Sequence, residues 1–234
     1  MIDRSAFRAV SYGLYIVTAR DAEQKYGCVI NTFQQVTSAP ARVSIALNKE
    51  NATTQAILDT GRYAVTVLGE QATMDLIGVF GFRSSLEVDK FADVAWEEDP
   101  FGVPRVTEGA VAQFSLRVVE TLDVGTHIMF IGEVEEAYPV EGDVPMTYAY
   151  YHEVKRGKTP AKASSYVPKE EAALAPAEAA ADVSADVQPA ETAPKKYAWQ
   201  CSICGHIEYV DELPEDYECP LCGMGVDMFE RIEV

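Results

Sequence analysis

Residues 197–225 read YAWQCSICGHIEYVDELPEDYECPLCGMG and contain two Cys-x-x-Cys-Gly units. Cys201 and Cys204 form the first pair, and Cys219 and Cys222 form the second, with 14 residues between the pairs. Glycine after each pair allows the positive φ of a tight turn that aims backbone N–H groups at sulfur. Four thiolates around one ion make a tetrahedral site for iron or zinc. The spacing therefore favours a metal site over free thiols or disulfides.

The composition limits what kind of protein carries this unit. The chain has 234 residues, 48% of them hydrophobic, and a formal net charge of -18. Such an acidic balance argues against nucleic acid and anionic membranes as partners. We find neither a basic start followed by an apolar stretch nor a run of about 20 apolar residues, so we expect no signal peptide and no membrane span. The clustering of four of the five cysteines in the last 34 residues fits metal binding in a reducing cytoplasm.

Three regions follow one another along the chain. Residues 1–158 read as one globular domain, and residues 197–234 form the cysteine module. Between them, residues 159–196 are rich in Ala, Pro and Glu and nearly lack aromatic residues. Such a segment cannot bury enough apolar area to offset its ordering entropy, so we expect a flexible linker.

The globular domain reads as mainly β, with few helices. Glycine, asparagine, aspartate and proline separate short β-rich runs, which we place at 14–19, 26–33, 42–47, 63–68, 112–120 and 127–138. Helical patterns occupy 51–61, which ends on the C-cap signal Gly61, and 71–81; a short helix is also expected after Asp3. Many strands with few helices favour a barrel over a doubly wound sheet.

The cysteine module resembles rubredoxin in the stretches CSICG and CPLCG and in the aromatic residues around them. Its loop is short and resembles the compact version at the end of rubrerythrins, which leaves a zinc ribbon open as an alternative. The resemblance implies one iron that carries one electron without changing its ligands. His206 reads as a surface residue. The small core is predicted to contain Tyr197, Trp199, Tyr209, Tyr217 and Phe229.

The module is strongly acidic. It contains nine acidic residues and a single basic residue, Arg231. Two interpretations remain open: a solvated face, or a docking surface that steers a basic redox partner by charge.

A polar stretch at 31–38 separates two apolar runs of the globular domain and precedes Pro40. A one-electron iron centre fed by NADH needs a converter, and a flavin accepts hydride and releases electrons singly. The domain has no G-x-G-x-x-G after a strand, so a Rossmann site is not supported. Polar loops between barrel strands offer donors to a planar heterocycle, although such residues are commonly ordinary loop residues. Cys28, before this stretch, reads as a buried small hydrophobe.

The globular domain resembles the flavin reductase-like family, the FMN-binding split barrels related to flavoredoxin. The resemblance rests on the stretches GCVINTFQQVTSAPARVSIAL, NKENATTQAI, SSLEVDKF and GTHIMFIGEV. Gln35 stands where serine is commoner, and a single Pro40 replaces a usual pair. The resemblance implies an FMN-binding split β-barrel whose cofactor contacts come from Asn31, Thr32, Phe33, Gln35, Val36, Thr37, Asn48, Lys49, Thr53, Thr54, Lys90 and His127.

Within that set, Thr53 and Thr54 open a helix whose N-terminus favours the FMN phosphate. Lys90 is a candidate phosphate or ribityl ligand, with a surface lysine as the alternative. His127 is the candidate for positioning the nicotinamide, because hydride transfer itself needs no acid or base; a structural histidine on a strand is the alternative.

The whole arrangement resembles the high-molecular-weight rubredoxins of anaerobic bacteria. That resemblance implies a cytoplasmic NADH:rubredoxin-type oxidoreductase that passes electrons from NADH through FMN to iron, and then to a flavodiiron protein that reduces oxygen or nitric oxide. It also implies a homodimer formed through the barrel. Two alternatives are an electron-transfer flavoprotein reduced by another protein, and a zinc-ribbon interaction module on a barrel without flavin.

Overall fold

The computed structural model describes residue 2 and residues 4–160, 163–166, 197–214, 216–220 and 222–233. The body begins with a 3-10 helix, η1 (Arg4–Ala9), and its α-helices are α1 (Ala52–Thr60), α2 (Met74–Phe82) and α3 (Tyr148–Glu153). Its strands are β1 (Tyr15–Arg20), β2 (Lys25–Ile30), β3 (Gln34–Ser38), β4 (Ala41–Asn48), β5 (Arg62–Leu68), β6 (Trp96–Glu98), β7 (Pro104–Val106), β8 (Ala110–Asp123) and β9 (His127–Pro139). The cysteine module contains β10 (Tyr197–Cys201), β11 (Ile207–Glu208), η2 (Val226–Met228) and β12 (Phe229–Glu233).

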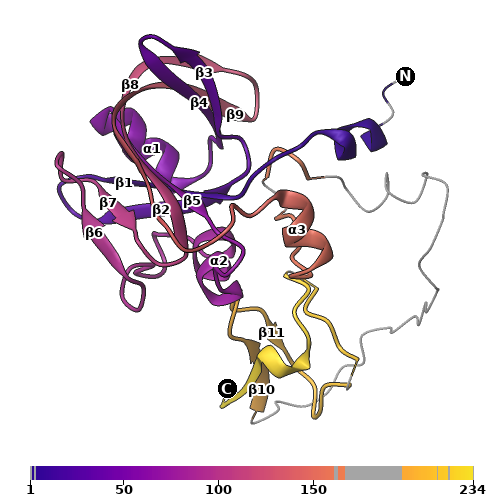
Figure 1. Ribbon diagram of the computed structural model, residues 1–234. Helices are drawn as coiled ribbons and strands as arrows, with labels where there is room; N and C mark the ends of the chain where they lie inside the picture. The colour runs from indigo at the N-terminus through magenta and orange to yellow at the C-terminus, as the bar shows by residue number, and fades with distance from the viewer. Residues whose placement is uncertain are drawn as a thin grey trace.

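Seven strands of the body form one antiparallel sheet in the order β2-β1-β5-β8-β9-β4-β3. The sheet curls around α1, and α2 and α3 lie at its other side (Figure 1). Register shifts interrupt the long β8–β9 hairpin at two places, and bulges of this kind bend and twist a strand pair. The expected mainly β fold with few helices is confirmed.

The body has two apolar clusters, one on each side of β1. Val17 contributes to the inner cluster, which includes Ile57 of α1. Its neighbour Ile16 contributes to the outer cluster, which includes Leu76 and Phe80 of α2. Successive side chains of a strand point to opposite faces, so β1, whose residues 16–19 are all buried, is covered from both sides. This explains why the first β run of the sequence shows no polar alternation.

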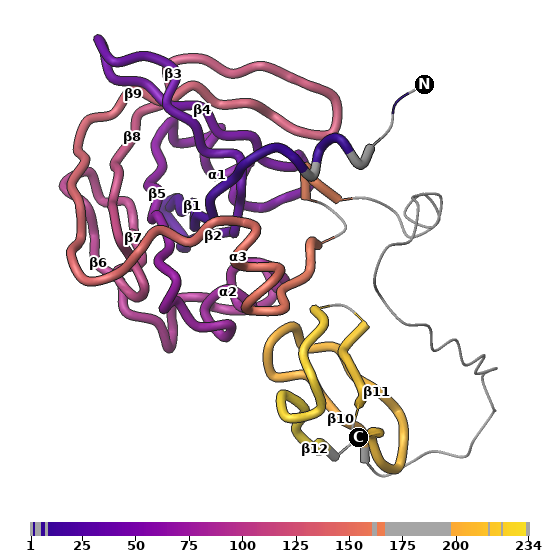
Figure 2. Tube along the Cα trace, turned by 45° about the vertical axis from the view of Figure 1, so that its right-hand side comes forward, coloured from indigo at the N-terminus to yellow at the C-terminus, as the bar shows by residue number. Residues whose placement is uncertain are grey.

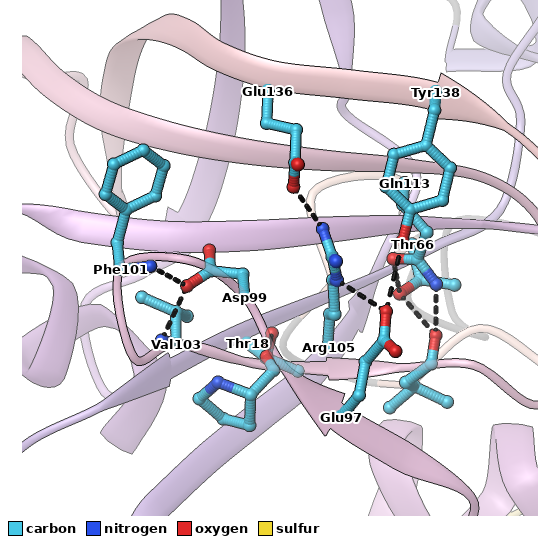
Figure 3. Close-up of polar contacts among 12 residues, drawn as sticks. Thr18, Thr66, Glu97, Asp99, Phe101, Val103, Arg105, Gln113, Glu136 and Tyr138 are labelled. Atoms are coloured by element: carbon cyan, nitrogen blue, oxygen red, sulfur yellow. Dashed lines mark hydrogen bonds and ion pairs between the residues drawn. The ribbon is translucent and has the colours of Figure 1, made fainter.

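The β6–β7 hairpin is fastened over the sheet by a buried arginine, shown in Figure 3. Arg105 is only 7% exposed. Its guanidinium donates from Nε to Glu97 (2.9 Å) and from Nη1 to Glu136 of β9 (2.6 Å). Its Cζ also lies 4.9 Å from the ring centre of Tyr138. A buried charge needs such partners, and here they join the hairpin to β9.

Neutral hydrogen bonds complete this attachment. The carbonyl of Val106 accepts from Thr66 Oγ1 (2.9 Å) and from Gln113 Nε2 (2.6 Å), and Thr18 donates to the carbonyl of Pro104. These contacts supply partners for polar groups that burial would otherwise strip of water, and Figure 3 shows them on one side of the hairpin.

In the cysteine module, β10 is the central strand of a small antiparallel sheet between β11 and β12. Its core contains Cys201, Cys219 and Cys222 with Ile203, Met224 and Phe229, and the partly buried Cys204, Trp199 and Tyr217 pack against it. The predicted core role is therefore confirmed for Phe229, Trp199 and Tyr217. It is wrong for Tyr209, which is 60% exposed. The side chain of Tyr197 lies outside the described part.

Three features of the body differ from the sequence-based expectations. Five of the eight residues in the polar stretch 31–38 form strand β3, which pairs with β4 around a register shift next to Val36. The hairpin β6–β7 and helix α3 were not anticipated.

Most of the expected linker, at 161–162 and 167–196, lies outside the described residues, as does Asp3. Residues 159–160 and 163–166, however, lie against the body, where Ser165 Oγ accepts from Asn31 Nδ2 at 3.0 Å. Within the described ranges, no helix combines the length and the apolar character that crossing a bilayer requires.

Candidate functional site

The four cysteine sulfurs of the module converge on one point. Their Sγ atoms all lie within 4.8 Å of one another, with 3.5 Å between Cys201 and Cys222 and 3.4 Å between Cys204 and Cys219. A disulfide needs about 2.05 Å, so these are separate sulfurs. A tetrahedron with metal–sulfur bonds of about 2.3 Å has edges of about 3.8 Å. The sulfur set therefore fits a four-thiolate metal ion.

Both turns that carry these sulfurs have the same backbone pattern. In the first, Gly205 N donates to the carbonyl of Cys201 (2.9 Å); in the second, Gly223 N donates to that of Cys219 (2.8 Å). The two glycines have φ of 77° and 78°, which other L-residues adopt at a cost. Glycine at these positions is thus what allows each Cys-x-x-Cys turn to close.

The pKa values of the cysteines shift in different directions: burial raises the pKa of Cys201, and interaction with the Cys204 thiol raises the pKa of Cys222. The pKa of Cys204 is lowered to about 5. The largest cause is the interaction with the neighbouring Cys222 thiol, and the backbone N–H of His206 lowers the pKa further. Metal ligation requires thiolates. His206 Nε2 lies 3.2 Å from Glu208 Oε2, away from the sulfur set.

The body contains a cavity of about 470 Å³, within the usual range for a small-molecule site. It lies where β2, the start of α1, the end of α2 and α3 come together, and its wall includes apolar side chains such as Leu14, Val29 and Ile77. Polar groups that line it are Asn31, Thr32, Asn48, Glu50, Asn51, Arg83, Ser84, Ser85, Glu87, Lys90, Tyr148, Tyr151 and Ser164.

Lys90 is the buried cation of this cavity. It is 4% exposed, and its Nζ donates to the carbonyl oxygens of Gly27 (2.8 Å) and Phe80 (3.1 Å). Burial lowers the pKa of Lys90 to about 8. Cys28, buried as expected, lies on the same wall, and burial raises the pKa of its thiol. A lysine held in this way is a fixed charge available to an anionic group.

Helix α1 begins at the same cavity. Asn51 is its N-cap, and its Oδ1 accepts from Thr53 N at 3.0 Å. Asn51 and Ala52 both line the cavity, and the N-terminal end of a helix favours an anion. Together with Lys90, this end of the cavity fits a phosphate, while the apolar wall fits a planar ring.

The structure brings four of the predicted cofactor residues together at this cavity: Asn31, Thr32, Asn48 and Lys90. Asn31 is buried, and Thr32 Oγ1 donates to the carbonyl of Ala46 at 2.9 Å. Their side chains therefore have fixed positions in the wall.

The other predicted cofactor residues are not part of this wall. Phe33 packs between Tyr15 and Phe114, with ring centres 5.1 Å from each. Four more lie elsewhere: Gln35, Val36 and Thr37 are exposed on β3, and Lys49 pairs with Asp123. Thr53 and Thr54 are buried inside α1. For these residues, contact with a cofactor stays a prediction.

His127 begins β9, opposite Asn48 of β4 in the strand register. Its Nδ1 lies 2.8 Å from Thr126 Oγ1, and partial burial lowers its pKa. It is the direct cross-strand partner of the cavity residue Asn48, but it does not itself line the cavity.

Sequence reasoning missed much of the opposite wall. Ser84 and Ser85 follow α2, and Ser85 Oγ accepts from Gly27 N at 3.2 Å. Tyr148 comes from α3, and its hydroxyl lies 2.6 Å from Thr159 Oγ1. The serine pair before Lys90 was the available signal. The aromatic run YAYYHE at 148–153 had no period that could show which rings face the cavity.

Comparisons with known proteins divide the chain in the same way. Residues 7–158 match the family model described as "Flavin reductase like domain", and residues 199–230 match "Rubrerythrin, rubredoxin-like domain". A high molecular weight rubredoxin of Moorella thermoacetica is 35% identical over 247 residues, covering 99% of this chain and 100% of the relative. A ferric-chelate reductase (NAD(P)H) of Archaeoglobus fulgidus is 44% identical over 165 residues, covering 70% of this chain and 98% of the relative.

Solved structures agree with these relatives. The NADH:FAD oxidoreductase SgcE6 of Streptomyces globisporus, in complex with NAD and FAD fragments, has 26% identity and a TM-score of 0.56, over 63% of this chain and 90% of that one. A flavin reductase-like domain implies a flavin, and a rubredoxin-like domain with four converging sulfurs implies one iron; both expected cofactor types are confirmed. The chain therefore belongs to the flavin reductase-like family, and it carries a rubredoxin-like domain in addition.

Proposed function

We propose that this chain is an NADH:rubredoxin-type oxidoreductase, which takes electrons from NADH and delivers them to a protein acceptor. The observation that carries the proposal is that one chain contains both the cavity of a flavin reductase-like domain and a converging four-thiolate site. FMN in the cavity would supply the conversion between two-electron hydride chemistry and one-electron transfer. The relative from Moorella, similar over nearly the whole chain, supports this combination.

In this proposal the residues of the cavity have distinct roles. Lys90 and the N-terminal end of α1 hold the FMN phosphate by charge and by backbone N–H groups. Asn31, Thr32 and Asn48 supply hydrogen bonds to the polar parts of the cofactor. His127 orients the nicotinamide from the start of β9. The remaining predicted contacts are proposed to form around the same cofactor: Phe33, Gln35, Val36, Thr37, Lys49, Thr53 and Thr54.

Cys201, Cys204, Cys219 and Cys222 hold the iron in this proposal. The acceptor is a redox protein such as a flavodiiron oxygen or nitric oxide reductase. A basic surface on that acceptor would complement the acidic module, and complementary charge speeds encounter. A homodimer formed through the barrel and a location in the cytoplasm belong to the same proposal. So do the domain limits 1–158, 159–196 and 197–234.

Removal of residues 197–234 should separate the two activities. We expect the shortened protein to oxidise NADH and reduce its flavin as the full chain does, because the Archaeoglobus relative matches the body over 98% of its own length. Delivery to the protein acceptor should fall by at least about tenfold, since tethering of the module raises its effective concentration. Stopped-flow absorbance of the flavin and oxygen uptake with a flavodiiron acceptor measure the two steps.

Equal delivery by the shortened protein would refute the role of the module. If NADH leaves the flavin of the full chain oxidised, the flavin is instead reduced by another protein.

The affinity for FMN should fall as the pH rises through about 8. Lys90 loses its charge in that range, because burial lowers its pKa to about 8, and a charged hydrogen bond contributes about 1.5–3 kcal/mol. The free energy of unfolding of the apoprotein should instead rise above pH 8. In that range Lys90 still binds its proton in the unfolded state but has lost it in the folded state. Fluorescence titration with FMN between pH 6.5 and 9.5 measures the affinity.

The matched variants are Lys90→Met and Lys155→Met. Lys90→Met should bind FMN about 10–100-fold more weakly at pH 7. Its affinity for FMN should no longer fall as the pH rises through about 8. Lys155→Met, a lysine that does not line the cavity, should keep both. If the FMN affinity of Lys90→Met still falls near pH 8, Lys90 is not the group whose titration controls FMN binding.

A further inference from the structure

The rubredoxin-like module lies against α2 and close to α3 in both views (Figures 1 and 2). Met74, Gly78 and Phe82 follow one another at intervals of four residues, so they share one face of α2. We call this the α2 docking face. Met74 and Phe82 pack against the apolar cluster that contains Cys201, Cys219 and Cys222, and Met74 also touches the outer cluster of the body. The opposite face of α2, with Leu76 and Phe80, packs into the body. Helix α2 is therefore a shared wall between the two domains.

Gly78 marks the closest approach of the two domains. A Cβ at this position would lie 2.3 Å from Ile203 Cγ2 and 3.0 Å from the carbonyl oxygen of Ile203. Ile203 lies between the first two cysteine ligands in the sequence. Glycine costs about 1 kcal/mol relative to alanine inside a helix, and here its missing side chain leaves room for the module backbone.

Two cations of the body hold the module at its edges. Arg83, directly after α2, donates from Nη2 to the carbonyl oxygen of Ser202 at 2.7 Å. Lys158 Nζ lies 3.6 Å from Glu218 Oε2, and the Lys158 stem lies next to Gly223. Both contacts put positive charge of the body against an acidic module, which favours this orientation.

Phe82 connects this interface to the cavity. It lines the cavity together with Arg83, and it packs against the cysteine cluster. We propose that the α2 docking face is the docking site of the rubredoxin-like module of the same chain, and that Phe82 positions the thiolate cluster against the flavin cavity. The docking is independent of the proposed function; its use in electron transfer rests on that function.

The number of electrons that NADH supplies determines how often the thiolate site must be reduced. Oxidation of one NADH to NAD⁺ and a proton releases two electrons, and a ferric site accepts one. The site must therefore be reduced twice, and the protein acceptor removes the first electron before the second arrives. Transfer rates fall steeply with distance, so the docked position is where the module is reduced.

The test compares glycine variants of α2 in the full chain loaded with iron and flavin. Gly78→Ala and Gly78→Leu place side chains into Ile203 and should undock the module progressively. Gly81→Ala is the matched control for the scattering measurement only, because its new methyl group meets Val29 of the cavity wall at 3.6 Å, an ordinary contact distance, and not the module. All three variants should fold at least as well as the parent, since they raise helix propensity. If Gly78 had a purely structural role, the Gly78 variants would therefore be more stable than the parent protein and the module would stay docked.

Small-angle X-ray scattering should show a larger radius of gyration for Gly78→Leu and no change for Gly81→Ala. Stopped-flow mixing of Gly78→Leu with NADH should show flavin reduction at the parental rate and iron–thiolate bleaching slowed by about tenfold or more. Unchanged scattering would overturn the docking site. Expansion with unchanged iron bleaching would overturn its role in electron transfer. If NADH fails to reduce the flavin in the parent protein, the proposed function fails, while scattering still decides the docking.

Discussion

Replacement of Cys219 by serine should remove the iron while leaving the flavin in place. The four sulfurs form the centre of the module core, and the described module buries little apolar side chain besides Ile203, Met224 and Phe229. Small domains of this size obtain much of their folding free energy from the metal. Loss of one thiolate should weaken iron binding by more than about 100-fold, because loss of a partner outside the ligand shell already costs 10–100-fold.

Iron content per chain and the visible iron–thiolate bands measure this effect. Cys28→Ala is the matched control, since it removes a buried cysteine from the cavity instead. We expect one iron per chain in Cys28→Ala, and almost none in Cys219→Ser. A Cys219→Ser protein that keeps a full iron complement would show that the four sulfurs do not form the metal site.

Replacement of Phe80 by alanine should produce a large loss of stability in the body. Phe80 is 1% exposed, and its ring meets Phe91 edge to face with centres 5.3 Å apart. A Cβ on Gly27 would lie 2.5 Å from the same ring, so the backbone is shaped around it. Removing a ring of this kind costs about 3–5 kcal/mol, a large share of a typical unfolding free energy of about 5–15 kcal/mol.

Urea unfolding of the apoprotein measures this loss without a contribution from bound cofactor. Phe7→Ala is the control, because Phe7 is 58% exposed and surface changes stay within about 0.5 kcal/mol. Phe80→Ala should also weaken FMN binding, since the ring lies 5.8 Å from Lys90 Nζ and helps to fix that side chain. A loss below about 1 kcal/mol would mean that neighbouring side chains refill the space.

The parts of the fold that the sequence predicted are those with strong local signals. Gly61 ends α1 with φ of 67°, as a left-handed C-cap requires. The cysteine spacing placed four sulfurs on one ion because both turns are closed by local hydrogen bonds. The long strands were recognisable because they are apolar and β-branched.

The parts that were missed depend on contacts distant in sequence. Strand β3 is exposed throughout and polar except for Val36, so only its pairing with β4 makes it a strand. Hairpin β6–β7 is three residues long on each side and depends on Arg105 bonding to β9. The cavity wall combines residues from β2, α2 and α3, and no local pattern reports which of their side chains converge.

The position of residues 159–160 and 163–166 has a mechanical consequence. Pro160, Ala163 and Ser164 line the cavity, and Ser165 Oγ accepts a hydrogen bond from Asn31, so these described residues are held at the cavity wall. Binding of the cofactor should stabilise residues 163–166 at this position, and loss of the cofactor should make them more mobile. The described residues that lead toward the rubredoxin-like module should therefore be held most firmly when the cofactor is bound.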